Sequence, residues 1–123
     1  MGNKNERLKK HLILSGTLVK EVLERIEAVG GNLLFVVKRD NTLIGSISDG
    51  DIRRGLIFGH GIEMEVDHFC EKSPKVLLFE EFDIEELIAL RENKYEIIPI
   101  IDSYNKIIDL INFDIFKSYL PVD

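Results

Sequence analysis

The sequence predicts an α+β fold built from two similar halves, and three observations predict it. Residues 34–45 align without gaps on residues 98–109, and in each segment a polar turn containing Asn separates two apolar runs, as in a β-hairpin. Apolar residues at helical spacing precede each hairpin, and a second helical stretch follows it. Each half is therefore expected to run strand, helix, strand, strand, helix.

In the first half, a short strand around Ile13 leads into a helix over residues 18–29. Thr17 is the expected N-cap of this helix, and Gly30 with Gly31 is the expected stop. The hairpin follows, because Asp and Asn tolerate turn conformations that β-branched residues do not. The last helix of this half is expected over residues 51–58.

In the second half, residues 76–79 form the expected first strand, and Asp83 caps a helix that ends near Asn93. The hairpin and a helix over residues 114–119 complete this half. Residues 59–74 connect the halves and are expected to contain a short helical turn. Because a half of about 60 residues buries little surface alone, we expect the halves to pack face to face through their sheets.

The composition excludes several classes of protein. The chain has 123 residues, of which 22 are acidic and 16 basic, for a net charge of -6. General binders of nucleic acid or anionic membranes usually have the opposite balance. No apolar run approaches the roughly 20 residues of a membrane span, and the single cysteine, Cys70, cannot form an internal disulfide. We therefore expect a cytoplasmic protein with no nucleic-acid or membrane partner.

Residues 43–54, with the sequence Leu-Ile-Gly-Ser-Ile-Ser-Asp-Gly-Asp-Ile-Arg-Arg, resemble the hallmark segment of the CBS domain. Residues 16–18 resemble the Thr-initiated first helix of that family, and residues 98–102 resemble the apolar-Pro-apolar-apolar-Asp strand of a second repeat. The resemblance implies a tandem CBS pair, or Bateman module, with repeats at residues 12–58 and 75–119 related by pseudo-twofold symmetry.

The resemblance also implies a function. Such pairs bind an adenine nucleotide (AMP, ADP or ATP) between their repeats and regulate without catalysing a reaction. Residues 49–54 are particularly similar to CBS pairs that precede sugar-phosphate nucleotidyltransferases of the mannose-1-phosphate guanylyltransferase type. The chain is thus expected to be the regulatory part of a longer enzyme with a covalently attached catalytic domain, and a homodimer that associates through its helices.

Ser48 and Asp51 form the centre of the expected site. A strand that ends at Ser48 and a helix that begins near Asp51 leave unpaired backbone N–H groups, which favour anions. The Ser48 hydroxyl would donate to a phosphate, Gly50 would let a ligand approach the backbone, and the Asp51 carboxylate would accept from ribose hydroxyls. Alternatively, Ser48 and Asp51 only cap the helix, which is the commonest role of these residue types at a helix start.

Further positions that match the family's ligand contacts extend the nucleotide-binding site. They are Asn32, Ser46, Asp49, Arg54, Lys75 and Val76. Ser46 shares a strand face with Ser48, and Lys75 with Val76 would border the base. Each type of residue also has a plainer interpretation, such as a turn Asn, a solvated Lys, a core Val or an ion-paired Arg.

The second repeat departs from the pattern of the first. It has Asp109 where the first has Gly45, Asn112 where the first has Ser48, and one residue fewer before Asp114. Because an extra carboxylate discourages a phosphate, we expect at most one nucleotide site per chain. The second repeat is expected to be a packing partner, with Phe113 in its core.

No other chemistry is indicated. His11, His60 and His68 lack the spacing of a metal site, and the chain has no nucleophile or phosphate-loop motif. No catalytic and no metal-binding residue is therefore expected. The competing hypothesis is a ligand-free CBS dimerisation module, in which Ser48 and Asp51 are caps and nothing more.

Overall fold

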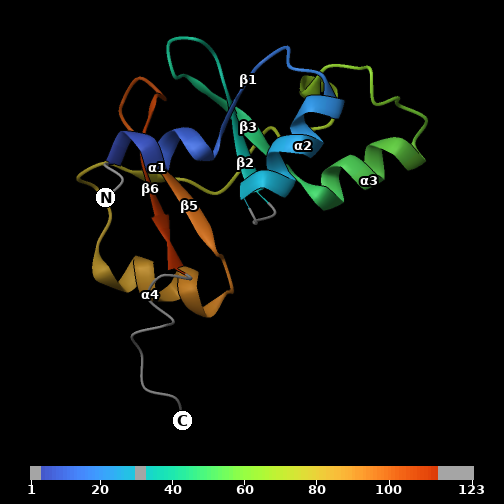
Figure 1. The fold of residues 1–123 in the computed structure, drawn as a ribbon. Coiled ribbons are helices and arrows are strands. Elements are labelled where there is room, and N and C mark those ends of the chain that lie inside the picture. Colours follow the sequence, from blue (N-terminus) through green and yellow to red (C-terminus); the bar gives the residue numbers. More distant parts are fainter. Residues whose placement is uncertain (1–3, 30–32, 114–123) are drawn as a thin grey trace. The chain divides into compact units, whose positions relative to one another are not determined.

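The chain folds into two compact units, Met1–Pro74 and Lys75–Asp123, each with its own three-stranded sheet and at least one helix (Figure 1). The computed structural model describes residues 4–29 and 33–113. The expected α+β class, with two repeats of similar strand order, is confirmed. Helix 114–119 and the stop at Gly30 and Gly31 lie outside the described residues.

The first unit contains a three-stranded sheet in the order β1-β2-β3, with β1 parallel and β3 antiparallel to the central strand. An N-terminal helix that the sequence did not predict precedes the sheet. The elements are α1 (Lys4–Lys10), β1 (Leu12–Leu14), α2 (Val19–Val29), β2 (Leu33–Val37), β3 (Leu43–Ser48), α3 (Asp49–Ile57) and the 3-10 helix η1 (Val66–His68).

Helices α2 and α3 cover one face of this sheet (Figure 1). Leu34 and Val36 alternate along β2 and meet Val22 of α2 and Ile52 of α3 in a core where all four side chains are buried. The connector joins the same core through Val66, which is fully buried. Burial of these side chains, at roughly 1.5–3 kcal/mol each, fixes the position of α3 on the end of β3.

The second unit repeats this layout with β4 (Leu77–Leu78), α4 (Ile84–Glu92), β5 (Ile97–Ile101) and β6 (Ile107–Asn112), in the order β4-β5-β6. The predicted cap is confirmed, because the Asp83 carboxylate accepts from the Glu86 N–H at 2.9 Å. Phe113 is buried in the core of this unit, as expected.

The internal repeat extends to the details of the two hairpins. Each hairpin shifts register at the same place, after Val36 in the first and after Ile100 in the second. Each turn has an asparagine at positive φ, Asn41 at 71° and Asn105 at 64°. Asn tolerates this left-handed region better than β-branched residues do, which explains why both turns carry it.

Two predicted helix starts are wrong. Thr17 does not precede α2 directly, because the helix begins at Val19 and the backbone of Leu18 pairs with Glu65 of the connector. Helix α3 begins at Asp49 and not at Asp51, because Ser48 itself is the N-cap. In both cases the backbone donors of the first turn find acceptors that local apolar spacing does not indicate.

Gly45 permits a close approach between β3 and the connector. The backbones of Ser46 and Glu71 exchange two hydrogen bonds, at 2.9 and 2.8 Å. A Cβ at Gly45 would lie 2.3 Å from the Glu71 carbonyl oxygen, which is a backbone atom and cannot move away cheaply. The free edge of β3 is therefore covered only if position 45 has no side chain.

We predict that Gly45→Ala lowers the free energy of unfolding by about 1–3 kcal/mol, as overpacking does. The matched control is Gly61→Ala, because a Cβ at Gly61 meets nothing within 4 Å, and its effect should stay within about 0.5 kcal/mol. Urea denaturation measures both. Equal stability of the two variants would contradict the close approach.

Candidate functional site

The candidate site lies where β3 ends and α3 begins, and it is organised by a reciprocal capping box. The Ser48 hydroxyl accepts from the Asp51 N–H at 3.1 Å, and the Asp51 carboxylate accepts from the Ser48 N–H at 2.9 Å. The Ser48 hydroxyl also lies 2.9 Å from the same carboxylate oxygen, to which it can donate. Each residue therefore fixes the orientation of the other, at the positive end of the helix dipole.

Arg54 completes this cluster from the next turn of α3. Its guanidinium donates to the second oxygen of the Asp51 carboxylate at 2.7 Å. The Arg54 side chain is 70% exposed, whereas that of Asp51 is 16% exposed. Gly50 lies beneath the guanidinium, since a Cβ there would be 3.3 Å from Arg54 Nη1. Ser48, Gly50, Asp51 and Arg54 are thus brought together in one place.

Two other predicted residues are engaged elsewhere. Asp49 pairs with Arg53 at 3.3 Å across the exposed side of α3. Ser46 is buried, and its backbone N–H and C=O both pair with Glu71. The alternation along β3 places Ser46 and Ser48 on the same face of the strand, as the sequence predicted.

The remaining predicted residues do not belong to this unit or are not described. Lys75 and Val76 open the second unit, where Lys75 lines a hollow of about 440 Å³ together with Asn93 and Tyr95. Asn32 lies outside the described residues.

An interaction that the sequence did not predict anchors the loop after β1. Asp67 of the connector accepts hydrogen bonds from the Ser15 hydroxyl at 2.5 Å and from the Gly16 N–H at 2.7 Å. Partial burial works to raise the pKa of Asp67, but these hydrogen bonds and the nearby Lys72 charge outweigh it, so its pKa lies below the ordinary value. No sequence motif indicates this contact, because Asp67 is far from Ser15 and Gly16 in the sequence.

The rest of the described chain gives no sign of a metal site, a reactive thiol or a membrane-spanning helix. Across residues 4–29 and 33–113, no three His, Cys, Asp or Glu side chains gather as metal ligands. Burial raises the pKa of the Cys70 thiol, which disfavours the reactive thiolate. None of the described helices has the length and apolar character that crossing a membrane requires.

Residues 12–57 match the CBS domain family. This segment contains the whole sheet of the first unit together with α2 and α3. The first repeat is a CBS domain. An uncharacterised protein of Helicobacter pylori is 32% identical to the chain over 104 residues, which are 82% of the chain and 31% of that protein. The chain thus spans about a third of the length of the curated relatives it matches.

Solved structures extend the CBS fold to both repeats. The structure described as CBSX2 in complex with AMP has a TM-score of 0.69 at 22% identity, covering 89% of this chain and 86% of that one. The Listeria monocytogenes CbpB protein in complex with c-di-AMP has a TM-score of 0.70 at 18% identity, covering 88% and 84%. The chain therefore has the fold of a tandem CBS pair.

We predict that Asp67→Asn lowers the free energy of unfolding at pH 7 by about 1 kcal/mol, because a charged acceptor is lost at a partly exposed position. A carboxyl with a lowered pKa stabilises the fold above its unfolded pKa, about 4, and this contribution disappears as the pH falls through the folded value. The difference in free energy of unfolding between Asp67→Asn and the wild type should therefore become smaller at acidic pH.

Urea denaturation between pH 7 and pH 3 checks this, with Asp49→Asn as the control on an exposed ion pair. A constant difference at every pH, or equal effects of the two substitutions, would argue against the anchoring role of Asp67.

Proposed function

We propose that this CBS pair is a noncatalytic regulatory module whose first repeat binds an adenine nucleotide, namely AMP, ADP or ATP. The observation that carries the proposal is the cluster of Ser48, Asp51 and Arg54 at the start of α3, on the strand-to-helix junction of a CBS domain. The AMP and c-di-AMP bound by proteins of the same fold support the choice of an adenine nucleotide.

The cluster supplies the groups that a ribose phosphate needs. The first N–H groups of α3 have no partner within the helix and favour a phosphate. The Ser48 hydroxyl can rotate from Asp51 to a phosphate oxygen, and the exposed Arg54 side chain can move from Asp51 to the same phosphate. Asp51 would then have free acceptor sites for the two hydroxyls of the ribose.

The other predicted contacts remain part of the proposal. Ser46, on the same strand face as Ser48, and Asn32, which precedes Leu33 in the sequence, would contact the phosphate or ribose, and Lys75 with Val76 would border the base. Asp49 is expected to contribute least to nucleotide binding. Its carboxylate pairs with Arg53, and a second negative charge disfavours phosphate.

A regulatory module needs a domain on which to act. We propose a covalently attached catalytic domain, since the matched relatives are much longer than the matched segment. A sugar-phosphate nucleotidyltransferase is the class that the resemblance of residues 49–54 implies. Nucleotide binding would bias this domain only by the difference in affinity between two states of the module.

A ligand-free dimerisation module is the second candidate, and two observations favour it. The capping box satisfies Ser48 and Asp51 without any ligand. In addition, apolar side chains are exposed at the end of α3, with Ile57 at 78% and Phe58 at 88% exposure. Such side chains at one helix end are suited to an interface with a second copy.

We predict that at least one of AMP, ADP and ATP raises the stability of the chain by about 2.7 kcal/mol at a hundredfold excess over its dissociation constant. Ser48→Ala and Asp51→Asn should each abolish this rise, measured from the variant's own baseline. Asp83→Asn is the matched control, because it alters the corresponding cap of α4 and should keep the full response. Thermal unfolding with a nucleotide panel measures all four proteins.

No response of the wild type to any adenine nucleotide would remove the proposed function, and so would an unchanged response in Asp51→Asn. A loss of about 1 kcal/mol in baseline stability for Ser48→Ala is expected under both candidates. Only the increase in stability that the nucleotide causes distinguishes the two candidate functions.

We predict that the chain is a homodimer through its helices and that Phe58→Glu shifts it to monomer, because a charge is costly in an apolar interface. Ile84→Glu is the control, since Ile84 is similarly exposed, at 71%, but lies on α4 of the second unit. Light scattering across a concentration series checks this. A monomeric wild type, or equal dissociation of both variants, would contradict an interface at α3.

A further inference from the structure

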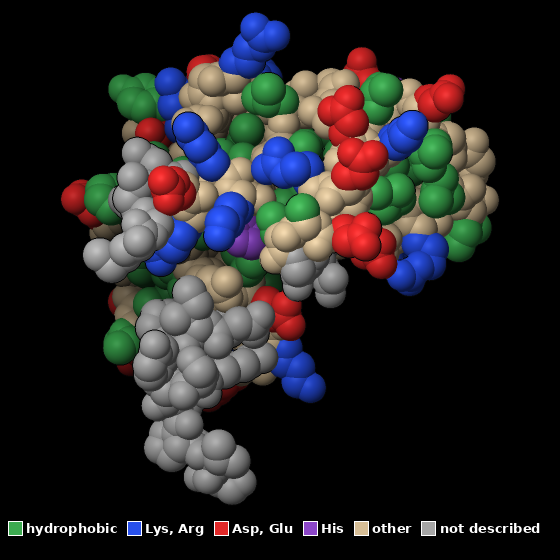
Figure 2. All heavy atoms as spheres, viewed as in Figure 1, with side chains coloured by type: hydrophobic (Ala, Val, Ile, Leu, Met, Phe, Trp, Pro, Cys, Tyr) green, Lys and Arg blue, Asp and Glu red, His purple; other side chains and the backbone are tan. Residues whose placement is uncertain are grey.

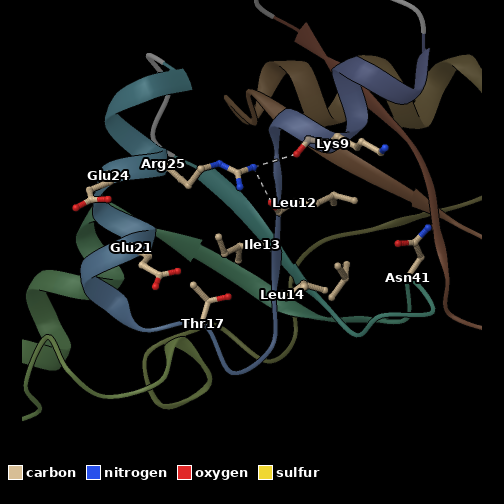
Figure 3. Close-up of a pocket in the computed structure, with 10 residues that line it drawn as sticks. Lys9, Leu12, Ile13, Leu14, Thr17, Glu21, Glu24, Arg25 and Asn41 are labelled. Carbon is tan, nitrogen blue, oxygen red and sulfur yellow. Dashed lines mark hydrogen bonds between the residues drawn. The ribbon is translucent and has the colours of Figure 1, made fainter.

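A hollow of the first unit follows the outer edge of β1 and is separate from the Ser48 cluster (Figure 3). Its volume is about 870 Å³, and Leu12, Ile13 and Leu14 form its floor. A second hollow of about 490 Å³ adjoins it, and the two share Leu14, Thr17, Glu21 and Val37. Together they form a groove along the whole of β1, which we call the β1 groove.

The floor of the β1 groove presents unpaired backbone donors. In the parallel pair with β2, alternate residues of β1 make the hydrogen bonds, as the bonds of the His11 carbonyl and the Ser15 N–H show. The N–H groups of Leu12 and Leu14 therefore point away from β2. Neither donates to any group in the part of the chain that the structure describes.

The carbonyl groups on the same edge are already engaged. The Arg25 guanidinium donates to the Leu12 carbonyl at 3.0 Å and to the Lys9 carbonyl at 3.1 Å (Figure 3). The Leu14 carbonyl accepts from the Thr17 N–H at 3.1 Å. The edge thus offers two donors and few free acceptors, so its occupant must bring acceptors. Pairing with the same edge of a second copy is disfavoured for this reason.

The two walls of the β1 groove carry opposite charges. Glu21 and Glu24 of α2 lie on one side of β1 together with Arg25, whose single positive charge leaves this wall net negative, and Lys9 lies on the other side with Asn41 (Figure 3). The turn that carries Asn41 adds Lys38 and Arg39 to the adjoining hollow. On the molecular surface, acidic side chains gather toward α2 and α3, and basic side chains lie between α1 and α2 (Figure 2).

We propose that the β1 groove binds an extended peptide segment of a partner protein, with basic and acidic side chains at alternate positions. The N–H groups of Leu12 and Leu14 are two residues apart, roughly 6.6 Å along a strand. An extended peptide presents alternate carbonyl groups at this same spacing, and it therefore matches both donors. Its side chains point alternately to either wall, so basic ones meet Glu21 and Glu24 and acidic ones meet Lys9.

A synthetic probe tests this proposal independently of nucleotide binding. The probe is a labelled peptide of about six residues, the usual length of a strand, in which lysine and aspartate alternate and both ends are blocked. A peptide of the same composition, with its lysines and aspartates in separate blocks, is the control. Fluorescence anisotropy measures binding, and amide shifts in NMR spectra locate it.

The expected result is saturable binding of the alternating peptide, weaker binding of the block peptide, and amide shifts at Leu12 and Leu14. Leu14→Pro removes one donor without removing a bond to β2, since edge strands tolerate proline, and should weaken binding about tenfold. The double variant Glu21→Lys, Glu24→Lys should weaken it comparably, and both positions are exposed, so the fold should persist.

Equal binding of the two peptides, or full affinity in the double variant, would overturn the proposal. The same holds for binding that leaves the Leu12 and Leu14 amides unshifted. Self-association that Leu14→Pro abolishes would assign the edge to a second copy instead and would also overturn it.

Discussion

The reciprocal capping of Ser48 and Asp51 is the interaction on which the candidate site depends. It turns β3 into α3 without a loop, and Ile52 one residue later locks the helix onto the sheet. Because strand, turn and helix are continuous, the serine hydroxyl, the aspartate carboxylate and the first N–H groups of α3 have fixed relative positions. A site that is organised before a ligand arrives loses less entropy on binding.

The same interaction explains why the two repeats are not equivalent. The second unit preserves the hairpin, the register shift and the asparagine turn of the first. It replaces Gly45 by Asp109 and Ser48 by Asn112, so it lacks both the side-chain-free position on the strand and the hydroxyl at its end. The repeated fold therefore persists while the residues suited to phosphate occur in the first repeat.

Features encoded locally could be predicted from the sequence. The hairpins follow from apolar runs around asparagine, and the cap at Asp83 follows from a polar residue ahead of a helical pattern. Features that depend on distant partners could not. The start of α2 is set by connector carbonyls of Ile62 and Met64, the loop at Gly16 is held by Asp67, and α1 is attached through Arg25. The cluster of Ser48 and Asp51 was predicted as a cap and as a ligand site, and a capping box is compatible with both.

A titration of the isotope-labelled chain with AMP, ADP and ATP, followed through its backbone amide resonances, tests the central claim most directly. If the β3–α3 junction holds a ribose phosphate, the amides from Ser48 to Arg54 should shift in a saturable way with at least one of these nucleotides. Spectra in which these amides stay unmoved at saturating concentrations of all three, or in which only distant amides respond, would contradict the account.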